Sequence, residues 1–277
     1  MGNIYYSGKN PTRRHLLRAA AGLAALSGLP AGFEEAAFAQ CAVVGAPSLT
    51  EGPYFVDEIL NRSDIRSDPD TGVLQPGFPL VLTLNFSRVD DCVVTPLAGA
   101  FVDIWHCNAA GVYSDVAAQS STGQRYLRGY QITDRGGRVE FTTIYPGWYQ
   151  GRAVHIHFKV RFFSKMQETY EFTSQLFFED AFSDEIYRLA PYSSKGSPDT
   201  RNAADGIYSG ASALGSITRN SGDYLLLKAK NEGHYASSEF NLILDVAAGS
   251  TPDQPGGAGG PGGGPGGPPP GGGPPPR

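Results

Sequence analysis

The sequence predicts an all-β protein, a sandwich or a partly closed barrel in which long loops connect the strands. Short runs of apolar residues alternate with polar ones, as in strands that bury one face. No stretch shows a long helical period. Pro, Gly and aromatic residues interrupt the chain throughout, which is typical of strands joined by turns.

The segment Leu80–Val89 shows the alternation most clearly. Leu82 and Phe86 point to one side and Thr83 and Asn85 to the other, which predicts a half-buried strand. Further strands are expected, in chain order, at Phe101–Cys107, Leu127–Thr133, Arg138–Tyr145, Val154–Phe163, Tyr170–Phe178, Tyr224–Lys230 and Phe240–Val246.

Turn residues separate these segments. Asp134–Gly137 contains two Gly residues and predicts a hairpin between the strands on either side, and Pro96–Gly99 predicts another. Asn231–Gly233 predicts a turn between the last two strands. The weakly patterned stretch Phe182–Ile217 is expected to form long loops, with a short helical turn at Asp184–Leu189.

Residues 1–39 have the features of an export signal. A basic start with the paired Arg13 and Arg14 precedes a mildly apolar run, Ala19–Leu29, and the small-residue site Ala37–Ala39. The apolar run is too short for a membrane span. The paired arginines favour the twin-arginine route over an ordinary secretory signal, so we expect a periplasmic or extracellular protein.

The other end is a tail of low complexity. From Pro255 to Arg277 every residue except Ala258 and Arg277 is Gly or Pro, so residues 252–277 cannot bury apolar surface and are expected to be disordered. The tail could act as a spacer or contact a cell wall or extracellular polymer. Residues 40–251 remain, a length that suits one domain.

Charge and cysteine content narrow the function classes further. The net charge is −5, and removal of four basic and two acidic residues with the leader makes it −7, so neither nucleic acid nor an anionic membrane is an expected partner. Three cysteines are too few for a disulfide scaffold. Cys92 and Cys107 lie at unequal distances from the expected turn between them, so a bridge from Cys41 to Cys92 is favoured, with one thiol left over.

The clearest chemical signal is His155-Ile156-His157. In a strand the two imidazoles share one face, and their Cα atoms lie roughly 6.6 Å apart, so both can reach one metal ion. The opposite face, with Ile156 and Phe158, is apolar and should pack on the core. A solvated polar face that continues through Lys159 and Arg161 is the alternative interpretation.

Two tyrosines stand near this strand. Tyr149 precedes His155 by a short turn, and Tyr113 follows Gly111 where the chain leaves an expected strand. A phenol has a pKa of about 10, so it ligates well at neutral pH only when the metal is acidic enough to remove its proton. Fe(III) is such an ion. Core or interface aromatic residues are the alternative.

Several separated motifs resemble, in their order, the intradiol ring-cleavage dioxygenases, a family that includes catechol 1,2-dioxygenase and protocatechuate 3,4-dioxygenase. An exported branch with Trp-His-Cys and Pro-Gly-Trp-Tyr segments is most similar. The motifs are Glu51–Tyr54, Asp103–Tyr113, Leu127–Gln131, Thr143–Tyr149, Gly151–Phe158 and Thr173–Phe178.

The resemblance implies a β-sandwich with a non-haem Fe(III) centre. Tyr149 and His157 would be the axial ligands, and Tyr113 and His155 the equatorial ones. The implied reaction inserts O2 into catechol-type rings and gives muconate-type diacids. The oligomeric state and the ring substituents that the enzyme accepts stay open.

The resemblance also implies roles for three further residues. Arg152 would lie beside the substrate and act in catalysis, with a surface salt bridge as its structural alternative. Gln175 would lie near the oxygen pocket, or else be a satisfied buried amide. Tyr54 would form a wall of the substrate cleft.

Two other functions compete with the dioxygenase. A non-catalytic exported β-sandwich module would not need two tyrosines and two histidines in this arrangement. A zinc hydrolase could use His155, His157 and a carboxylate such as Asp103, but it leaves Tyr113 and Tyr149 unexplained. The sequence also contains no His-Glu-x-x-His motif.

Overall fold

The structure is a computed structural model that describes residues 45–90, 92–165, 167–214 and 217–246. The expected export signal and the Gly/Pro-rich tail lie outside the described residues, so the boundaries 1–39, 40–251 and 252–277 remain predictions. Among the described residues, no helix has the length and apolar character needed to cross a membrane.

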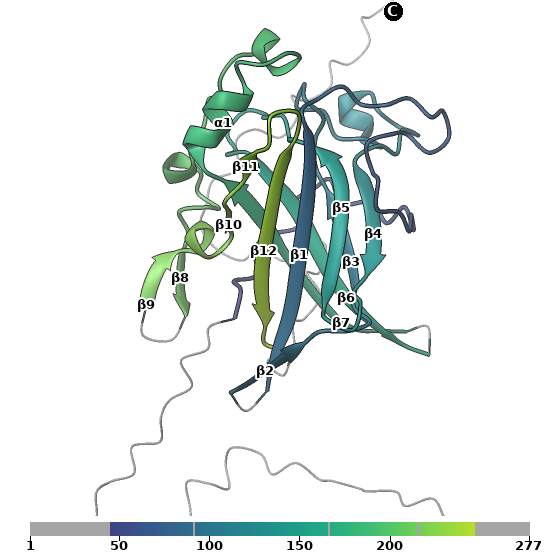
Figure 1. Cartoon of the computed structure of the whole chain (residues 1–277), viewed down its shortest axis with the longest axis vertical. Coiled ribbons are helices and arrows are strands. Elements are labelled where there is room, and N and C mark those ends of the chain that lie inside the picture. Colours follow the sequence, from purple (N-terminus) through teal and green to yellow (C-terminus); the bar gives the residue numbers. More distant parts are fainter. Residues whose placement is uncertain (1–44, 91, 166, 215–216, 247–277) are drawn as a thin grey trace, which may run out of the picture. The chain divides into compact units, whose positions relative to one another are not determined.

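The first of two five-stranded sheets is built around β1 (Figure 1). Strand β12 runs parallel to β1 along one edge. The other edge of β1 pairs antiparallel with β5 over its first half and with β2 over its last residues. The strands of this sheet are β1 (Pro79–Asp90), β2 (Val93–Pro96), β5 (Arg138–Ile144), β11 (Lys230–Asn231) and β12 (Ala236–Leu244).

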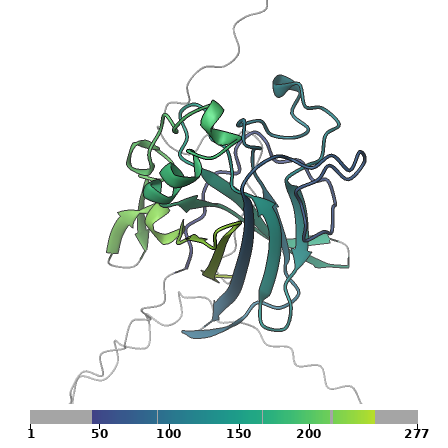
Figure 2. The same cartoon turned by 45° about the horizontal axis from the view of Figure 1, so that its top comes forward.

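The second sheet carries the His-Ile-His strand near its centre. Its order is β10-β7-β6-β3-β4, and it packs against the first sheet, as Figures 1 and 2 show. Its strands are β3 (Phe101–Trp105), β4 (Arg128–Ile132), β6 (His155–Ser164), β7 (Gln167–Phe178) and β10 (Leu226–Leu227). The expected all-β sandwich is therefore confirmed.

The core lies between the two sheets. Leu82 and Phe86 of β1 are fully buried, as the alternation predicts, and so are Ile156 and Phe158 on the inner face of β6. The rings of Phe86 and Phe158 lie 6.0 Å apart across the sandwich. Full burial of each such side chain contributes roughly 1.5–3 kcal/mol. The inner face of β6 is thus fixed by packing, which leaves its outer face, with both imidazoles, available for chemistry.

The prediction of a hairpin at Asp134–Gly137 is wrong. A turn is present, because Gly137 N donates to Asp134 O, but β4 and β5 belong to different sheets. Gly137 has a φ of +79°, and a Cβ there would lie 2.1 Å from Phe86 O. This close approach carries the chain onto β1 and so into the other sheet. Pro96–Gly99 likewise connects the two sheets, since β2 and β3 do not pair.

The C-terminal half differs most from expectation. The expected strand Tyr224–Lys230 is replaced by the end of a 3₁₀ turn and the two short strands β10 and β11. The helical element is α1 (Asp180–Ile186), four residues earlier than expected. A small hairpin of β8 (Ala211–Leu214) and β9 (Ile217–Asn220) lies in the stretch expected to be loop.

The cysteines agree with the expected pairing as far as the described residues reach. Cys92 is disulfide-bonded, and Cys107 is free and buried. The bridge between Cys92 and Cys107 that we disfavoured is therefore absent, and Cys107 is the thiol left over. Cys41, the expected partner of Cys92, lies outside the described residues.

Candidate metal centre

Four side chains from three separate stretches of the chain meet at one point. His155 Nε2 lies 3.1 Å from His157 Nε2, 3.2 Å from the Tyr149 hydroxyl and 3.3 Å from the Tyr113 hydroxyl. The structure thus brings together all four residues that the sequence singled out as metal ligands. Two phenol oxygens and two imidazole nitrogens face a common centre.

Close backbone packing brings the two tyrosines together. A Cβ at Gly111, whose φ is +84°, would lie 2.2 Å from Trp148 O, and one at Gly147 would lie 2.2 Å from Asn108 O. Only glycine allows the loop before Tyr113 and the loop before Tyr149 to approach so closely. The two tyrosine rings consequently lie 5.7 Å apart, edge to face.

A lysine joins the same two loops. Lys195 Nζ donates to Ala110 O at 2.7 Å and to Trp148 O at 2.5 Å, and it lies over the Trp148 ring. The two phenols are therefore held by the fold itself.

The His155 imidazole is oriented as metal-ligating imidazoles usually are, by a hydrogen bond to its second ring nitrogen. His155 Nδ1 lies 2.6 Å from Ala153 O, so Nδ1 carries the proton and the lone pair of Nε2 points to the centre. The His157 ring stacks on the ring of Trp105, with the two centroids 4.9 Å apart and the two planes 8° from parallel. Burial lowers the pKa of both histidines well below the usual 6.5, and the charge of Arg152 lowers it further. Both rings are thus neutral, the form that binds metal.

Burial changes the pKa of the two phenols in the opposite direction to that of the imidazoles. Burial raises the pKa of Tyr113 well above 10 and that of Tyr149 to about 12. Both would keep their protons at neutral pH unless a strongly acidic cation displaced them. A hard trivalent ion meets that requirement, and two anionic oxygens with two imidazoles suit Fe(III). The donor set therefore fits non-haem ferric iron.

The described residues do not supply the zinc site considered above. They contain no group of three or more His, Cys, Asp and Glu side chains placed to hold a metal. Asp103, the carboxylate considered for it, pairs with Arg161 at 2.8 Å and lies opposite Lys159 in the sheet rather than at the imidazoles.

Arg152 and Gln175 also reach the centre. Arg152 Nη1 lies 3.4 Å from the Tyr149 hydroxyl, and Nη2 donates to Gln175 Oε1. Gln175 Nε2 donates to Thr50 O at 2.8 Å, so this amide is satisfied and also contacts the arginine. The Arg152 side chain is 16% exposed and its ion-pair partner, Asp205, only 1%, so the pair is not a surface salt bridge. Asp205 is a residue that sequence reasoning missed.

Tyr54 reaches the site on a segment that crosses the outer face of the second sheet. Its ring stacks on Tyr113 at 4.7 Å. Lys159 and Arg161, which could have belonged to a solvated polar face, are instead buried beneath this segment. Lys159 Nζ pairs with Glu51, and Arg161 Nη1 with Asp57 at 2.6 Å. The outer face of β6 is therefore a covered, charged surface that holds the segment in place.

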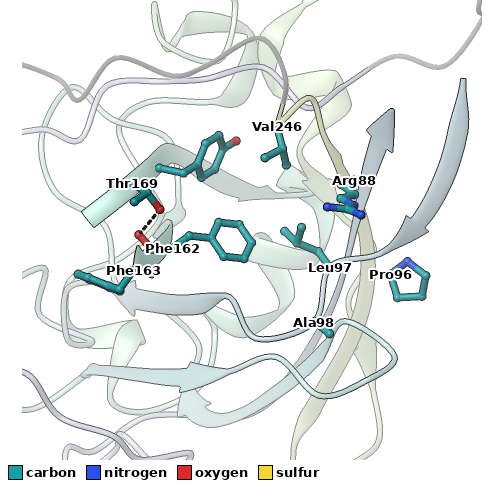
Figure 3. A pocket seen from close by; sticks show the side chains of 9 residues that line it. Arg88, Pro96, Leu97, Ala98, Phe162, Phe163, Thr169 and Val246 are labelled. Atoms are coloured by element: carbon teal, nitrogen blue, oxygen red, sulfur yellow. Dashed lines mark hydrogen bonds between the residues drawn. The ribbon is translucent and has the colours of Figure 1, made fainter. Parts of the chain in front are cut away.

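A groove at the other end of the sandwich does not belong to this centre (Figure 3). It encloses about 640 Å³ and is lined by aromatic side chains such as Phe162 and Tyr170, with Arg88 at its edge. Phe162 is seven residues from His155 along β6, which is roughly 23 Å of strand. The groove and the four-residue cluster are thus separate features.

His106 gives the fold a specific sensitivity to acid. Its Nδ1 donates to Cys107 O at 2.9 Å, and its Nε2 lies 2.7 Å from Thr143 Oγ1. Burial lowers its pKa to about 4. The unfolded chain takes up this proton near pH 6.5, so the associated stability is present above that pH and is lost as the pH falls to 4.

We expect the free energy of unfolding to fall by about 2 kcal/mol more in the wild type than in His106→Gln between pH 7 and pH 4.5. Urea titrations of both proteins at the two pH values measure this difference. Equal pH dependence in the two proteins would contradict the assignment.

Comparison with known proteins identifies the family. The family model described as Dioxygenase matches residues 50–190, half of the chain, and all four residues of the cluster lie within the match. An intradiol ring-cleavage dioxygenase from Tetranychus urticae has a similar structure, with a TM-score of 0.61 and 27% identity over 73% of this chain and 95% of that one. The chain belongs to the intradiol ring-cleavage dioxygenase family.

Two curated relatives of this family are similar in sequence. Catechol 1,2-dioxygenase 1 of Acinetobacter lwoffii is 29% identical over 151 residues, which is 46% of each chain. Chlorocatechol 1,2-dioxygenase of Pseudomonas putida is 28% identical over 160 residues, which is 51% of this chain and 56% of that protein. The chain thus spans about half the length of these intradiol dioxygenases.

Proposed function

We propose that the protein is a non-haem Fe(III)-dependent intradiol dioxygenase that inserts O2 into catechol-type aromatic rings and yields muconate-type diacids. The observation that carries this proposal is that two phenol oxygens and the His157 imidazole nitrogen lie 3.1–3.3 Å from His155 Nε2. A non-catalytic β-sandwich module would have no need of this buried donor set. The names of the relatives agree with the substrate class.

Tyr113, Tyr149, His155 and His157 would hold the iron. When bound, a ferric ion supplies Lewis acidity toward the two catechol oxygens and draws electron density from the ring. The protein contributes a largely buried donor set. Burial keeps each imidazole neutral. A hydrogen bond to Ala153 O orients the His155 ring, and stacking on Trp105 orients the His157 ring.

The two phenols are suited to different tasks. Tyr113 is fully buried and covered by Tyr54, whereas Tyr149 is partly exposed at the same centre. Tyr149, once it has become a phenolate, would therefore be the residue that accepts a proton from an incoming catechol hydroxyl. Its oxygen lies 3.4 Å from Arg152 Nη1, a donor that favours the phenolate before transfer.

Arg152 has a second task on the substrate. Negative charge accumulates on the catechol oxygens and ring as the second hydroxyl loses its proton. A fixed guanidinium in a partly dry site stabilises that charge without reorganisation. Tyr54 would form the wall of the cleft against which the ring lies.

The visible spectrum of the purified protein tests the proposal. Ferric tyrosinate gives a red-brown charge-transfer band, which should shift when catechol is added. Ring opening under ¹⁸O2 should give a diacid that carries both labelled atoms. A colourless protein with stoichiometric iron would contradict the ligand set, and a coloured protein that leaves catechol intact would contradict the reaction.

A further inference from the structure

We propose that Asp205 is a positioning residue of this centre, which fixes the guanidinium of Arg152 in its working orientation. The inference rests on the proposed function, because it assigns Arg152 a task on the substrate. Asp205 lies in the long connection after α1, far along the chain from every motif of the site.

The Asp205 carboxylate is buried and fully occupied as an acceptor. Its side chain is 1% exposed. Oδ2 accepts from Arg152 Nε at 2.9 Å and from Ala153 N at 2.8 Å. Oδ1 accepts from Ile207 N at 2.7 Å and from Tyr208 N at 3.3 Å. Four donors from two segments leave this carboxylate one orientation.

The loop that carries Asp205 is itself anchored beside the centre. Asp205 follows a 3₁₀ turn at Asn202–Ala204, and Asn202 Nδ2 donates to Phe178 O at 2.7 Å, at the end of β7. The ring of Tyr208 packs edge to face on Phe177, with centroids 5.0 Å apart. β7 also carries Gln175, so both partners of Arg152 are held by the same strand.

The guanidinium is consequently held on two of its three nitrogens. Nε binds Asp205 and Nη2 binds Gln175, so the planar fork turns Nη1 toward the Tyr149 hydroxyl. Neither contact alone would set this direction, because rotation about the last side-chain bonds would stay free. Asp205 thus acts on the substrate through Arg152 and need not touch it.

One alternative arises from Ala153. Its N–H donates to Asp205, and its carbonyl accepts from His155 Nδ1, so Asp205 could instead act on an iron-binding imidazole. The two routes differ in their consequence. Action through Arg152 changes turnover and leaves iron in place, whereas action through His155 changes iron content.

The test compares wild type, Asp205→Asn, Arg152→Ala and the double variant, all loaded with iron. We expect Asp205→Asn to keep its iron and its colour and to lose about 10- to 100-fold in kcat with catechol, since a displacement of about 1 Å costs that much. In the Arg152→Ala background the same change should cost less than about twofold. Added guanidinium should restore part of the activity of Arg152→Ala but not of the double variant.

Asp184→Asn is the matched control. It removes the partner of Arg201 from the same part of the chain, at a half-buried ion pair away from the four-residue cluster, and should leave kcat unchanged. Should Asp205→Asn not fold, Asp205→Glu provides the same test, because glutamate keeps the charge and its longer side chain displaces the carboxylate from Arg152 Nε. It should lose kcat to a similar extent.

Three results would overturn the inference. These are an equal loss of kcat on Asp205→Asn in both backgrounds, a loss of iron in Asp205→Asn, and a crystal structure of Asp205→Asn in which the guanidinium keeps its place. An unmoved guanidinium in the crystal structure of Asp205→Asn would contradict the inference even if the wild type does not open catechol rings. If the wild type shows no ferric tyrosinate band or does not open catechol rings, the proposed function is contradicted instead.

Discussion

An Arg152→Ala variant should bind iron, keep its charge-transfer colour and lose about 10²- to 10³-fold in kcat. The expected loss corresponds to roughly 2.7–4 kcal/mol of barrier, the usual cost of removing one preorganised donor from a site of developing charge. None of the four proposed ligands is removed by this change. Steady-state oxygen uptake with catechol, together with iron analysis, measures both quantities.

The division of this effect between kcat and KM is informative. An interaction that matters only as charge develops lowers kcat and kcat/KM together, whereas a simple binding contact raises KM alone. Arg201→Ala is a suitable control, since Arg201 forms a half-buried ion pair with Asp184 and its loss should leave kcat and KM unchanged. Near wild-type kcat in Arg152→Ala would refute the assigned role.

A Tyr113→Phe variant should lower iron affinity by more than about 100-fold, because even an outer partner of a metal ligand typically contributes 10- to 100-fold. The substitution removes one oxygen and keeps the ring that stacks on Tyr54 at 4.7 Å, so the fold should be preserved. Any iron that remains should give a weaker and displaced charge-transfer band. Metal titration followed by visible absorption measures both effects.

Tyr145→Phe separates this result from a general effect of losing a buried hydroxyl. Tyr145 is as buried as Tyr113, and its hydroxyl lies 2.7 Å from Ser183 Oγ, away from the four-residue cluster. Its loss should cost about 1 kcal/mol of stability and leave the spectrum unchanged. The same loss of iron in both variants would contradict a ligand role for Tyr113.

Sequence patterns predicted the parts of the fold that depend on local periodicity. The alternation in β1 and the two faces of β6 follow from side-chain direction in a strand, so residues a few positions apart were sufficient. The pairing of strands was not predicted in the same way. The turn at Asp134–Gly137 is present, yet the partner of β5 is β1, whose paired residues lie 53 to 65 positions earlier in the chain. Strands of two to four residues, such as β10, are too short to show a period.

The residues of the site likewise differ in whether local sequence or tertiary contacts reveal them. The spacing of His155 and His157 in a strand predicts that they share one face, and the motifs around the two tyrosines indicate their role. Asp205 stands in Ala-Ala-Asp-Gly, a context typical of an exposed turn, and nothing nearby indicates burial beside an arginine. Its function depends on where α1 and the following loop place it. Tertiary structure alone supplies that information.

The ion pairs beneath residues 51–57 have a consequence for the order in which the molecule assembles. Asp57 and its partner Arg161 are separated by 104 positions, so the segment bearing Tyr54 can settle only after β6 has joined its sheet. Until then the outer face of β6, with His155 and His157, is open to solvent. Afterwards residues 51–57 cover it. Cofactor insertion would thus have a natural window late in folding, before residues 51–57 cover this side of the centre.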